Sequence, residues 1–535
     1  MATTAGAPAI QHVSEAARQH PDRAALICVP SGLRCSYAEL DAAANRAAHA
    51  LRQLGLAPGD SIAFCLPNGT AFATLMLAAL RTGLYYTPLP TKASASDIAY
   101  ICNDAGARLL VLDEASDARA ALPALLAGGC ALLASHVNPV RPGAWEQLLA
   151  RQPASVPDAL CRGMEMVYSS GSTGRPKGVR KPMPQGPWNA PDPRNAAIAS
   201  AVQLRIDSVY LSTSPLYHSA PHRYLAASLN AGATVVVMER FDAQASLEYI
   251  DRFGCTHSLW VPTMFHRLLK LDDGVRRCYR GMRHHTAIHG AAPCPVPLKR
   301  AMIDWWGPIL IEYYSGSEGL GSTTIDSHEW LAHPGSVGKP SQVDVHVLDK
   351  QYQPLPPGQV GTIFFNAPNA FAYWRDEQKT RGATSPQGWK TYGDIGYKDE
   401  DGYLYLTDRS SFTVISGGVN VYPQEVENTL LSHPDVQDAA VFGVPDEDLG
   451  EKLAAVIQLN DGNAGDARQA QILQAFCRAA GGSIKTPKLI RFCVEFPRTD
   501  SGKVQKARLR EQFLQERDAP TFGHMQSGSR PPPPV

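Results

Sequence analysis

Met166-Val-Tyr-Ser-Ser-Gly-Ser-Thr-Gly-Arg-Pro-Lys-Gly178 is the stretch of the chain that is most informative about its fold. A short apolar strand leads into a loop of hydroxyl residues and glycines, and Lys177 closes the loop. Glycines let backbone N–H groups approach an anion closely, and hydroxyls with one lysine add donors and a positive charge. The stretch therefore predicts a phosphate-binding loop, although taken alone it is also compatible with a flexible turn. The P-loop pattern GxxxxGK[ST] is not met, because Lys177 precedes Gly178.

On both sides of this loop, short β-rich runs alternate with helical patterns from about residue 20 to residue 400. Such alternation is typical of layered α/β proteins. We expect a helix over Ala42–Leu54 that ends at Gly55, because glycine tolerates the left-handed conformation found at helix C-termini. The strands that we predict are Ser61–Cys65, Val209–Thr213, Thr234–Met238, Ser258–Val261 and Leu310–Tyr314.

The length of 535 residues predicts more than one domain, since single hydrophobic cores stop growing at roughly 250–300 residues. The composition changes near Asp408, and a compact α+β pattern with basic clusters follows. We predict a large N-terminal domain over residues 1–408 and a smaller C-terminal domain over residues 409–517. The proline-rich end, residues 518–535, has the composition of a disordered tail.

Fifty basic and fifty acidic residues leave no net charge, and a hydrophobic content of 44% is typical of a globular enzyme. Nucleic acid is not expected as a partner, because phosphate binding normally shows as excess Lys and Arg. The eleven cysteines form no CxxC pair, which indicates free thiols in a reducing compartment. The N-terminus lacks the pattern of a signal peptide, and no apolar run is as long as a membrane span. We expect a cytoplasmic protein.

The loop at 166–178 resembles the phosphate-binding signature of the adenylate-forming superfamily, which includes acyl- and aryl-CoA synthetases, adenylation domains of peptide synthetases and firefly-type luciferases. Other segments similar to the family's motifs follow in order, so the resemblance covers roughly residues 10–515 and is greatest to bacterial acyl-CoA synthetases. These segments are Pro215-Leu-Tyr-His-Ser-Ala220, His289-Gly-Ala-Ala-Pro293, Glu312-Tyr-Tyr-Ser-Gly-Ser-Glu318, Pro334-Gly-Ser-Val-Gly-Lys-Pro340, Trp389-Lys-Thr-Tyr-Gly-Asp-Ile-Gly396, Asp408–Glu427 and Pro497-Arg-Thr-Asp-Ser-Gly-Lys503.

The resemblance implies an α/β fold whose large N-terminal part has two doubly wound subdomains and a distorted β-barrel. A small, mobile α+β C-terminal domain would pivot about Ser411, where the family usually has Asp or Lys. Phe412 follows at a position where an acid is common. A hinge needs backbone freedom more than a particular charge, so we expect altered rates and retained function.

The resemblance also assigns residues to the nucleotide and its metal. Glu318 would hold magnesium, since carboxylates suit hard cations that bridge phosphate oxygens. Tyr314 would stack on adenine, and Asp394 would accept hydrogen bonds from the ribose hydroxyls. Ser315 and Ser317 replace the family's Gly and Thr, and Ser317 keeps a hydroxyl for the phosphate. The residues expected at the nucleotide are Ser169, Ser170, Gly171, Ser172, Thr173, Gly174, Lys177, Gly290, Ala291, Ala292, Pro293, Glu312, Tyr313, Tyr314, Ser317, Asp394, Arg409 and Lys503.

Lys503 is expected to act as the family's catalytic lysine, between the attacking carboxylate and the α-phosphate. Glu318, Thr173 and His218 complete the implied catalytic set. The walls of the acid pocket are expected to include Tyr217, His218, Gly290, Ala291 and Gly316, with His289 nearby.

Four histidines, His218, His222, His284 and His285, are also considered as metal ligands or surface residues. Alone, His218 would be read as a core histidine, and His222 four residues later would only hint at a metal pair. No third ligand of a suitable type follows them, so we expect no metal there. We interpret His284 and His285 as surface residues.

The implied reaction converts a carboxylic acid and MgATP to an acyl-adenylate and pyrophosphate, and then uses coenzyme A to form the acyl-CoA and AMP. The implied cofactors are ATP, Mg²⁺ and coenzyme A, and the acid is expected to be hydrophobic: a fatty, phenylpropenoid or steroid-side-chain acid of lipid metabolism. Lys485, Lys488 and Arg491 could bind the CoA phosphates or form a solvated basic face. Loading of a carrier-protein thiol, luciferase-type oxygenation and non-catalytic nucleotide sensing are alternative functions. The sequence is also compatible with a homodimer.

Overall fold

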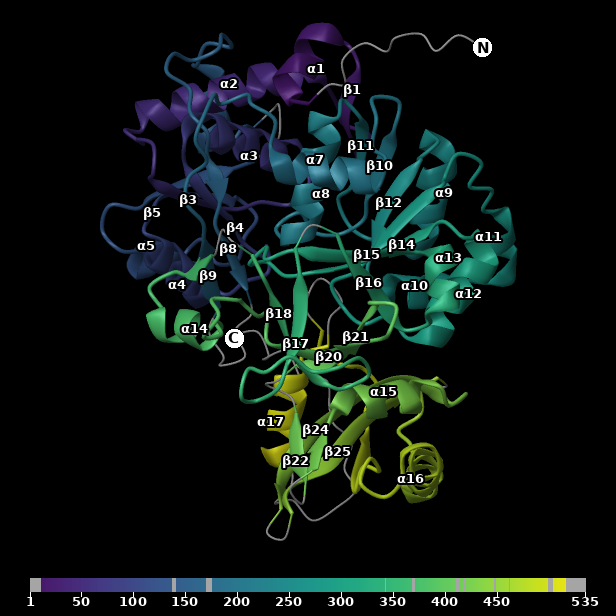
Figure 1. The fold of residues 1–535 in the computed structure, drawn as a ribbon. Coiled ribbons are helices and arrows are strands. Elements are labelled where there is room, and N and C mark those ends of the chain that lie inside the picture. The colour runs from purple at the N-terminus through teal and green to yellow at the C-terminus, as the bar shows by residue number, and fades with distance from the viewer. Residues whose placement is uncertain are drawn as a thin grey trace, which may run out of the picture. The chain divides into compact units, whose positions relative to one another are not determined.

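The computed structural model describes residues 11–136, 141–169, 176–341, 343–367, 371–409, 413–416, 419–446, 449–460, 462–498 and 504–515. The chain divides into two compact units, whose elements are labelled in Figure 1. The first consists of Met1–Ala291, Trp305–Leu320 and Pro368–Gly382, and the second of Ala292–Asp304, Gly321–Ala367 and Ala383–Val535. Within the described ranges, no helix has the length and apolarity needed to cross a membrane.

A mostly parallel sheet of buried strands crosses the first unit. Its strands lie in the order β14 (Leu310–Ser315), β13 (Thr286–His289), β12 (His257–Trp260), β10 (Val209–Ser212), β11 (Thr234–Met238), β1 (Ala24–Val29) and β2 (Arg34–Ser36). Strand β2 is antiparallel to β1, whereas the neighbouring strands from β14 to β1 pair in parallel. Strands buried on both faces have near-continuous apolar sequences, as in Thr234–Met238. The loops that follow β13 and β14 leave the same edge of this sheet.

A second parallel sheet of the first unit has helices against both of its faces. Its order is β6 (Ala131–Ser135), β5 (Ala107–Asp113), β3 (Ser61–Cys65), β4 (Tyr85–Pro88) and β7 (Met164–Glu165). Ile62 and Phe64 pack with α2 (Tyr37–Gln53) and α3 (Thr70–Thr82), whereas Ala63 and Cys65 pack with α4 (Ala95–Ala105). Successive residues of a strand point to opposite faces, which explains this division.

A small third sheet joins two distant parts of the first unit. Strand β9 (Lys177–Arg180) pairs antiparallel with both β8 (Val167–Ser169) and β19 (Ala372–Tyr373). The other helices of this unit are α1 (Val13–Gln19), α5 (Leu122–Leu125), α6 (Ala144–Ala150), α7 (Pro193–Ala201), α8 (Ser219–Asn230), α9 (Ala243–Phe253), α10 (Pro262–Leu269), α11 (Asp273–Cys278) and α14 (Glu377–Gly382).

The second unit contains an antiparallel sheet. Its strands lie in the order β17 (Val345–Leu348), β18 (Gly361–Phe365), β20 (Asp394–Lys398), β21 (Leu404–Arg409), β16 (Ser336–Pro340) and β15 (Ser322–Asp326). A Cβ atom at Gly338 would lie 2.0 Å from the carbonyl oxygen of Thr324, and one at Gly396 would lie 2.1 Å from that of Tyr405. The glycines of two sequence motifs are therefore required by close strand packing. In the sequence, helix α12 (Val296–Trp306) precedes β15 and helix α13 (Ser327–Ala332) follows it.

The C-terminal part of the second unit is a separate sheet with helices on both faces. Its strands are β23 (Val419–Val421), β22 (Val414–Ser416), β25 (Gly450–Leu459) and β24 (Val436–Asp446), and β26 (Leu489–Phe492) pairs parallel with β25. Val441 and Ile457 pack with α15 (Pro423–Leu431) and α16 (Ala467–Gly481). Phe442 and Val456 pack with α17 (Lys506–Gln515) on the other face (Figure 1).

These elements confirm the predicted mixed α/β fold, with several sheets in a large N-terminal part and a small separate C-terminal domain. Two predicted strands, Ser61–Cys65 and Thr234–Met238, have the observed bounds. The predicted helix over Ala42–Leu54 begins earlier, at Tyr37, because Ser36 and Glu39 form a capping box. The domain boundary at 408/409 stays a prediction, and the tail over 518–535 lies outside the described residues.

Candidate functional site

The strands β8 and β9 hold the two ends of the predicted phosphate loop. Ser169 pairs with Lys177 across these antiparallel strands, so the two ends of the predicted loop lie side by side. The predicted residues Ser170, Gly171, Ser172, Thr173 and Gly174 lie outside the described residues, as does the side chain of Ser169. Lys177 is the member of this set whose side chain can be placed.

Lys177 is held by a carboxylate from the β19–α14 segment. Its Nζ donates to Asp376 Oδ2 at 2.8 Å, and both side chains keep partial access to solvent. This hydrogen bond is the main cause that raises the pKa of Lys177 above its ordinary value and lowers that of Asp376. The ammonium is therefore charged at neutral pH, and a phosphate that binds Lys177 must compete with Asp376.

Two neighbouring strands bring the next predicted segments together. His289 at the end of β13 pairs in register with Glu312 of β14, and His289 Nε2 lies 3.8 Å from Glu312 Oε2. A Cβ atom at Gly290 would lie 2.7 Å from the carbonyl oxygen of Tyr313, so this close approach needs glycine. The following residue, Ala291, has a positive φ of 67°, which bends the chain away from the strand. Gly290 and Tyr313 thus lie against each other.

The loop after β14 carries Glu318, the expected magnesium ligand. Its carboxylate is 9% exposed, and Tyr373 Oη donates to its Oε1 at 2.9 Å. Ser317 Oγ lies 3.3 Å from Ser219 Oγ at the start of α8. The hydroxyl that replaces the family's threonine is thus next to the aromatic–His segment. The remaining loop residues, Tyr314, Ser315 and Gly316, are partly or fully exposed.

His218 is the N-cap residue of α8. Its ring lies against Tyr217, with 4.2 Å between the ring centroids. Tyr217 and Tyr313 are both partly buried and pack against the main apolar core of the unit. The predicted wall residues Tyr217, His218 and Gly290 therefore belong to one unit with aromatic surroundings, which favours an apolar ligand beside them.

A buried charge cluster lies beside this loop, and no sequence motif indicated it. Glu165 accepts hydrogen bonds from Arg194 and from Arg223 Nε at 2.9 Å, and its Oε2 lies 2.6 Å from His222 Nε2. Arg223 Nη2 also donates to the carbonyl oxygen of Ser317 at 3.0 Å. Burial alone would raise the pKa of Glu165, but the charges of Arg194 and Arg223 and the bond to His222 hold it well below its ordinary value. Glu165 therefore stays ionised and anchors the loop of Ser317 through Arg223.

Lys181 is a second residue that the sequence interpretation missed. Its Nζ would lie 2.4 Å from a Cβ atom at Gly319, whose φ is +64°. Burial, followed by the charges of Arg223 and Arg194, lowers the pKa of Lys181 to about 8. The available signal was its position in the sequence, four residues after Lys177.

The histidine interpretations can now be compared with the structure. His222 is buried, and its Nε2 lies 2.6 Å from Glu165 Oε2. The expectation that it binds no metal stays a prediction. His285 is exposed, as predicted, but His284 is buried, so its assignment to the surface was wrong. Its Nε2 lies 2.6 Å from Ser258 Oγ and its Nδ1 lies 2.7 Å from Tyr279 Oη. These two hydroxyls satisfy both ring nitrogens, which permits burial.

The other predicted nucleotide residues belong to the second unit or lie outside the described part. Asp394 begins β20, is buried, and pairs across the sheet with the backbone of Arg409. Ala292 and Pro293 also belong to this unit. The side chain of Arg409, the hinge residue Ser411 and the lysine Lys503 lie outside the described residues.

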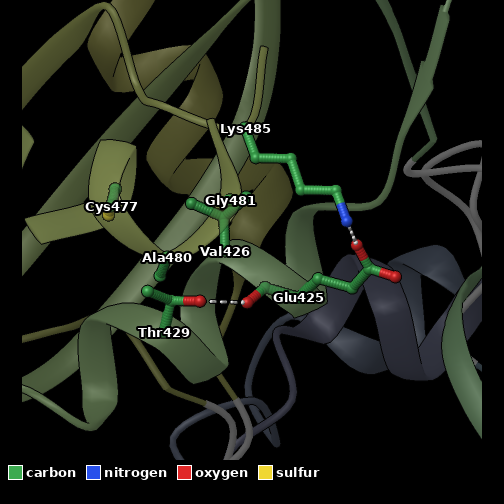
Figure 2. A pocket seen from close by; sticks show the side chains of 7 residues that line it. All are labelled: Glu425, Val426, Thr429, Cys477, Ala480, Gly481 and Lys485. Atoms are coloured by element: carbon green, nitrogen blue, oxygen red, sulfur yellow. Dashed lines mark hydrogen bonds and ion pairs between the residues drawn. The ribbon is translucent and has the colours of Figure 1, made fainter. Parts of the chain in front are cut away.

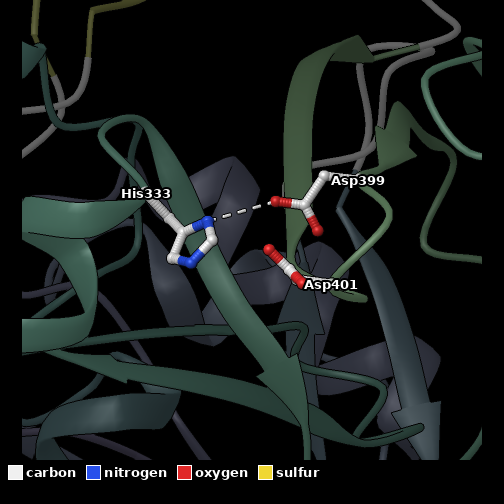
Figure 3. A group of neighbouring side chains, drawn as sticks. All are labelled: His333, Asp399 and Asp401. Carbon is white, nitrogen blue, oxygen red and sulfur yellow. Dashed lines mark ion pairs between the residues drawn. The ribbon is translucent and has the colours of Figure 1, made fainter.

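One group with potential metal ligands occurs among the described residues: His333, Asp399 and Asp401, drawn in Figure 3. His333 Nδ1 lies 3.2 Å from Asp399 Oδ2, and the His333 ring stacks on Tyr403 with centroids 3.7 Å apart. Tyr405 donates to the same Oδ2, and the Tyr403 backbone N–H donates to Oδ1. Both Asp399 oxygens already accept hydrogen bonds from the protein. We therefore interpret this group as one that stabilises the turn between β20 and β21, and not as a metal site.

A pocket of about 190 Å³ lies between α15 and α16, as Figure 2 shows. Lys485, which lines it, pairs with Glu425 at 2.6 Å. Lys488 donates to the carbonyl oxygen of Ser483, and Arg491 donates to that of Phe513. Ligand pockets usually measure roughly 300–1,000 Å³. The pocket is therefore too small for coenzyme A, and the three basic residues each have a local partner.

Comparison with known families identifies both parts of the chain. A family model described as AMP-binding enzyme matches residues 13–374. A second model, described as AMP-binding enzyme C-terminal domain, matches residues 425–503. The first match alone covers more than half of the chain.

Named relatives align over nearly the whole length. A feruloyl-CoA synthase of Amycolatopsis sp. is 31% identical over 486 residues, which cover 90% of this chain and 94% of the relative. A sulfoacetate–CoA ligase of Cupriavidus necator is 32% identical over 506 residues, which cover 92% and 95%. The crystal structure of ATP-bound MatB from Rhodopseudomonas palustris superposes with a TM-score of 0.80 at 29% identity, over 95% of this chain and 99% of MatB.

Proposed function

The chain belongs to the AMP-binding enzyme family, as an acid–thiol ligase of the AMP-forming acyl-CoA synthetase group, and we propose that it activates a hydrophobic carboxylic acid for transfer to coenzyme A. The observation that carries this proposal is the arrangement of Lys177, Gly290 and Glu318 in one unit of the fold. The family match supports ATP as the nucleotide. The resemblance of the motifs, in their order along the chain, supports the two half-reactions.

Each residue has a physical task in the first half-reaction. A carboxylate resists attack by a thiol because oxide is a very poor leaving group, whereas AMP leaves readily from a mixed anhydride. In phosphoryl transfer the protein mainly positions groups and neutralises charge. Lys177 and the loop over 169–174 would hold the β- and γ-phosphates, with Thr173 in that loop. Lys503 would lie between the attacking carboxylate and the α-phosphate.

Magnesium fits the donor set at Glu318. This carboxylate is nine-tenths buried, and among the described residues its single hydrogen bond comes from the neutral Tyr373 hydroxyl. A buried carboxylate needs a compensating charge, and a hard divalent cation supplies one. Glu318 would hold the magnesium, which would supply positive charge beside the phosphates. Lys181, with a pKa near 8, would add a second positive charge beside the loop.

The hydrophobic nature of the acid rests on the proposed pocket walls. Tyr217, His218 and Gly290 would line the pocket, and Ala291 and Gly316 are small enough to leave room for a bulky group. The names of the relatives do not decide the matter, because feruloyl is a phenylpropenoid acyl group and sulfoacetate is small and anionic. We propose fatty, phenylpropenoid or steroid-side-chain acids as the class.

Coenzyme A is proposed as the thiol, and the cytoplasm as the place of reaction, because both substrates ATP and a reduced thiol are found there. Loading of a carrier-protein thiol is the main alternative. A panel of acids with ATP, magnesium and coenzyme A tests the proposal. Acid-dependent pyrophosphate release followed by CoA-dependent AMP formation supports it. Pyrophosphate release without thiol consumption favours a carrier protein, and absence of both favours a nucleotide sensor.

Replacement of Asp394 by Ala should raise the apparent requirement for ATP more than that for the acid. The ribose belongs to the nucleotide alone, and loss of a charged hydrogen-bond acceptor costs roughly 1.5–3 kcal/mol, or about 10- to 150-fold in affinity. Initial rates of acid-dependent pyrophosphate exchange, with each substrate varied in turn, measure both requirements. If the acid requirement rises instead, Asp394 does not contact the ribose.

Replacement of Glu318 by Gln should remove a charged magnesium ligand while keeping the shape of the side chain. We expect acid-dependent pyrophosphate exchange to fall by roughly tenfold or more at limiting magnesium, with partial recovery at high magnesium. Exchange rates across a magnesium series make the measurement. Equal rates of variant and wild type at limiting magnesium would exclude Glu318 as the ligand.

A further inference from the structure

Among the residues that the structure describes, Tyr373 forms a hydrogen bond with the Glu318 carboxylate. Its hydroxyl donates to Oε1 at 2.9 Å, and both residues are at least nine-tenths buried. A carboxylate has two oxygens, and a donor on one of them restricts how the group can turn. The carboxylate keeps lone pairs with which it could bind a cation. Neither residue type nor spacing in the sequence indicates this contact, because the two positions are 55 residues apart.

The segment around Tyr373 is firmly held in the first unit. Tyr373 pairs with Val179 on β9, and its backbone N–H donates to Thr380 Oγ1 at 3.0 Å. The Tyr373 ring packs edge-on against Phe371 at 4.9 Å between centroids, and Lys379 Nζ lies 4.1 Å from its centre. The Tyr373 hydroxyl therefore has little freedom to move away from Glu318.

The same segment also contacts the strand that leaves the phosphate loop. The backbone N–H of Trp374 donates to the carbonyl oxygen of Gly178 at 2.8 Å, and the Trp374 indole donates to the carbonyl oxygen of Asp104. Asp376, two residues later, holds Lys177. One short segment thus fixes a loop lysine through Asp376 and the Glu318 carboxylate through Tyr373.

We propose that Tyr373 is a positioning residue that orients the Glu318 carboxylate for magnesium. The inference rests on the proposed role of Glu318 and goes beyond it, because it assigns the preorganisation of the metal ligand to a residue of β19. Partners that orient a metal ligand typically contribute 10- to 100-fold to metal affinity. A phenol suits this task better than a cation would, because it orients the carboxylate without neutralising the charge that attracts magnesium.

Tyr373→Phe tests the proposal, because it removes the hydroxyl and keeps the ring packing. ATP is titrated into the protein in the absence of any acid, by calorimetry, at a series of free magnesium concentrations. We expect the half-saturating magnesium concentration to rise about tenfold, with ATP binding in the absence of magnesium unchanged. Acid-dependent pyrophosphate exchange should show the same shift and should recover at saturating magnesium.

Tyr403→Phe is the matched control, because it removes another tyrosine-to-carboxylate hydrogen bond, the one from Tyr403 to Glu329 at 3.2 Å. Melting temperatures of both variants show whether folding is affected. A magnesium requirement that is raised in Glu318→Gln but not in Tyr373→Phe overturns the positioning role. A requirement that is unchanged in both variants overturns the proposed function of Glu318 instead. A shift of similar size in Tyr403→Phe shows a general effect on stability and also overturns the proposal.

Discussion

Replacement of Lys503 by Ala is expected to lower adenylation by about 10²–10³-fold, the typical cost of losing one preorganised donor in a catalytic site. The ammonium of Lys503 would neutralise charge as the carboxylate meets the α-phosphate. The thioester step is different, because the family resemblance implies that the C-terminal domain has then rotated about Ser411 and this loop has moved away. A synthetic acyl-adenylate supplied with coenzyme A should therefore give thioester at a near-normal rate.

The two steps are measured separately, by acid-dependent pyrophosphate exchange and by thioester formation from supplied acyl-adenylate. Arg508→Ala is the matched control, since Arg508 is an exposed cation on α17, five residues beyond Lys503. It should change neither step. A folding defect would lower both steps together. If Lys503→Ala adenylates normally, or fails equally with supplied adenylate, the C-terminal part of the proposed mechanism is wrong.

Replacement of Glu165 by Gln is expected to destabilise the first unit by about 3–5 kcal/mol, because it leaves two buried or half-buried guanidinium groups without their counter-charge. Glu165 is buried against Arg194 and Arg223. The midpoint and slope of urea unfolding, followed by tryptophan fluorescence, measure the loss. Glu114→Gln is the matched control, since Glu114 forms an exposed pair with Arg119, and such pairs contribute little to stability.

The pH dependence gives this prediction a second readout. The pKa of Glu165 is held well below its ordinary value of 4.5 in the folded chain. A carboxyl group with a lowered folded pKa stabilises the fold above the ordinary pKa, and this contribution is lost as the pH falls through the folded pKa. The difference in the free energy of unfolding between wild type and Glu165→Gln should therefore be largest near pH 7 and should decrease below about pH 4.5. A difference that does not change with pH would mean that Glu165 packs by shape and not by charge.

Local patterns were sufficient for much of the fold. Thr234–Met238 consists mostly of β-branched apolar residues, which is typical of a strand buried on both faces. Gly338 and Gly396 were part of recognisable motifs, and the sheet of the second unit shows why these positions lack a side chain. Where the structure differs, as at Tyr37, a short-range cap between Ser36 and Glu39 extends the element. Such differences are small because they depend on neighbouring residues.

The burial of polar residues, in contrast, could not be predicted from local patterns. The adjacent histidines His284 and His285 have the same type and a similar context, yet one is buried and the other is exposed. The burial of His284 depends on Ser258 and Tyr279, which come from other elements and accept or donate at its ring nitrogens. The cost of burying a polar ring is decided by partners that a local pattern does not contain.

The sequence by itself determined the family and the residue types at the site: the hydroxyl- and glycine-rich loop closed by Lys177, and the carboxylate Glu318. Motif order carried this information, because chemistry demands particular groups at particular points of a loop. Only the tertiary structure decided which groups support them, namely Asp376 at Lys177, Tyr373 at Glu318, and Arg223 with Glu165 at the loop of Ser317. The physical reason is that hydrogen bonds and ion pairs act over about 3 Å in space, and chain folding alone brings residues 50 to 200 positions apart within that distance.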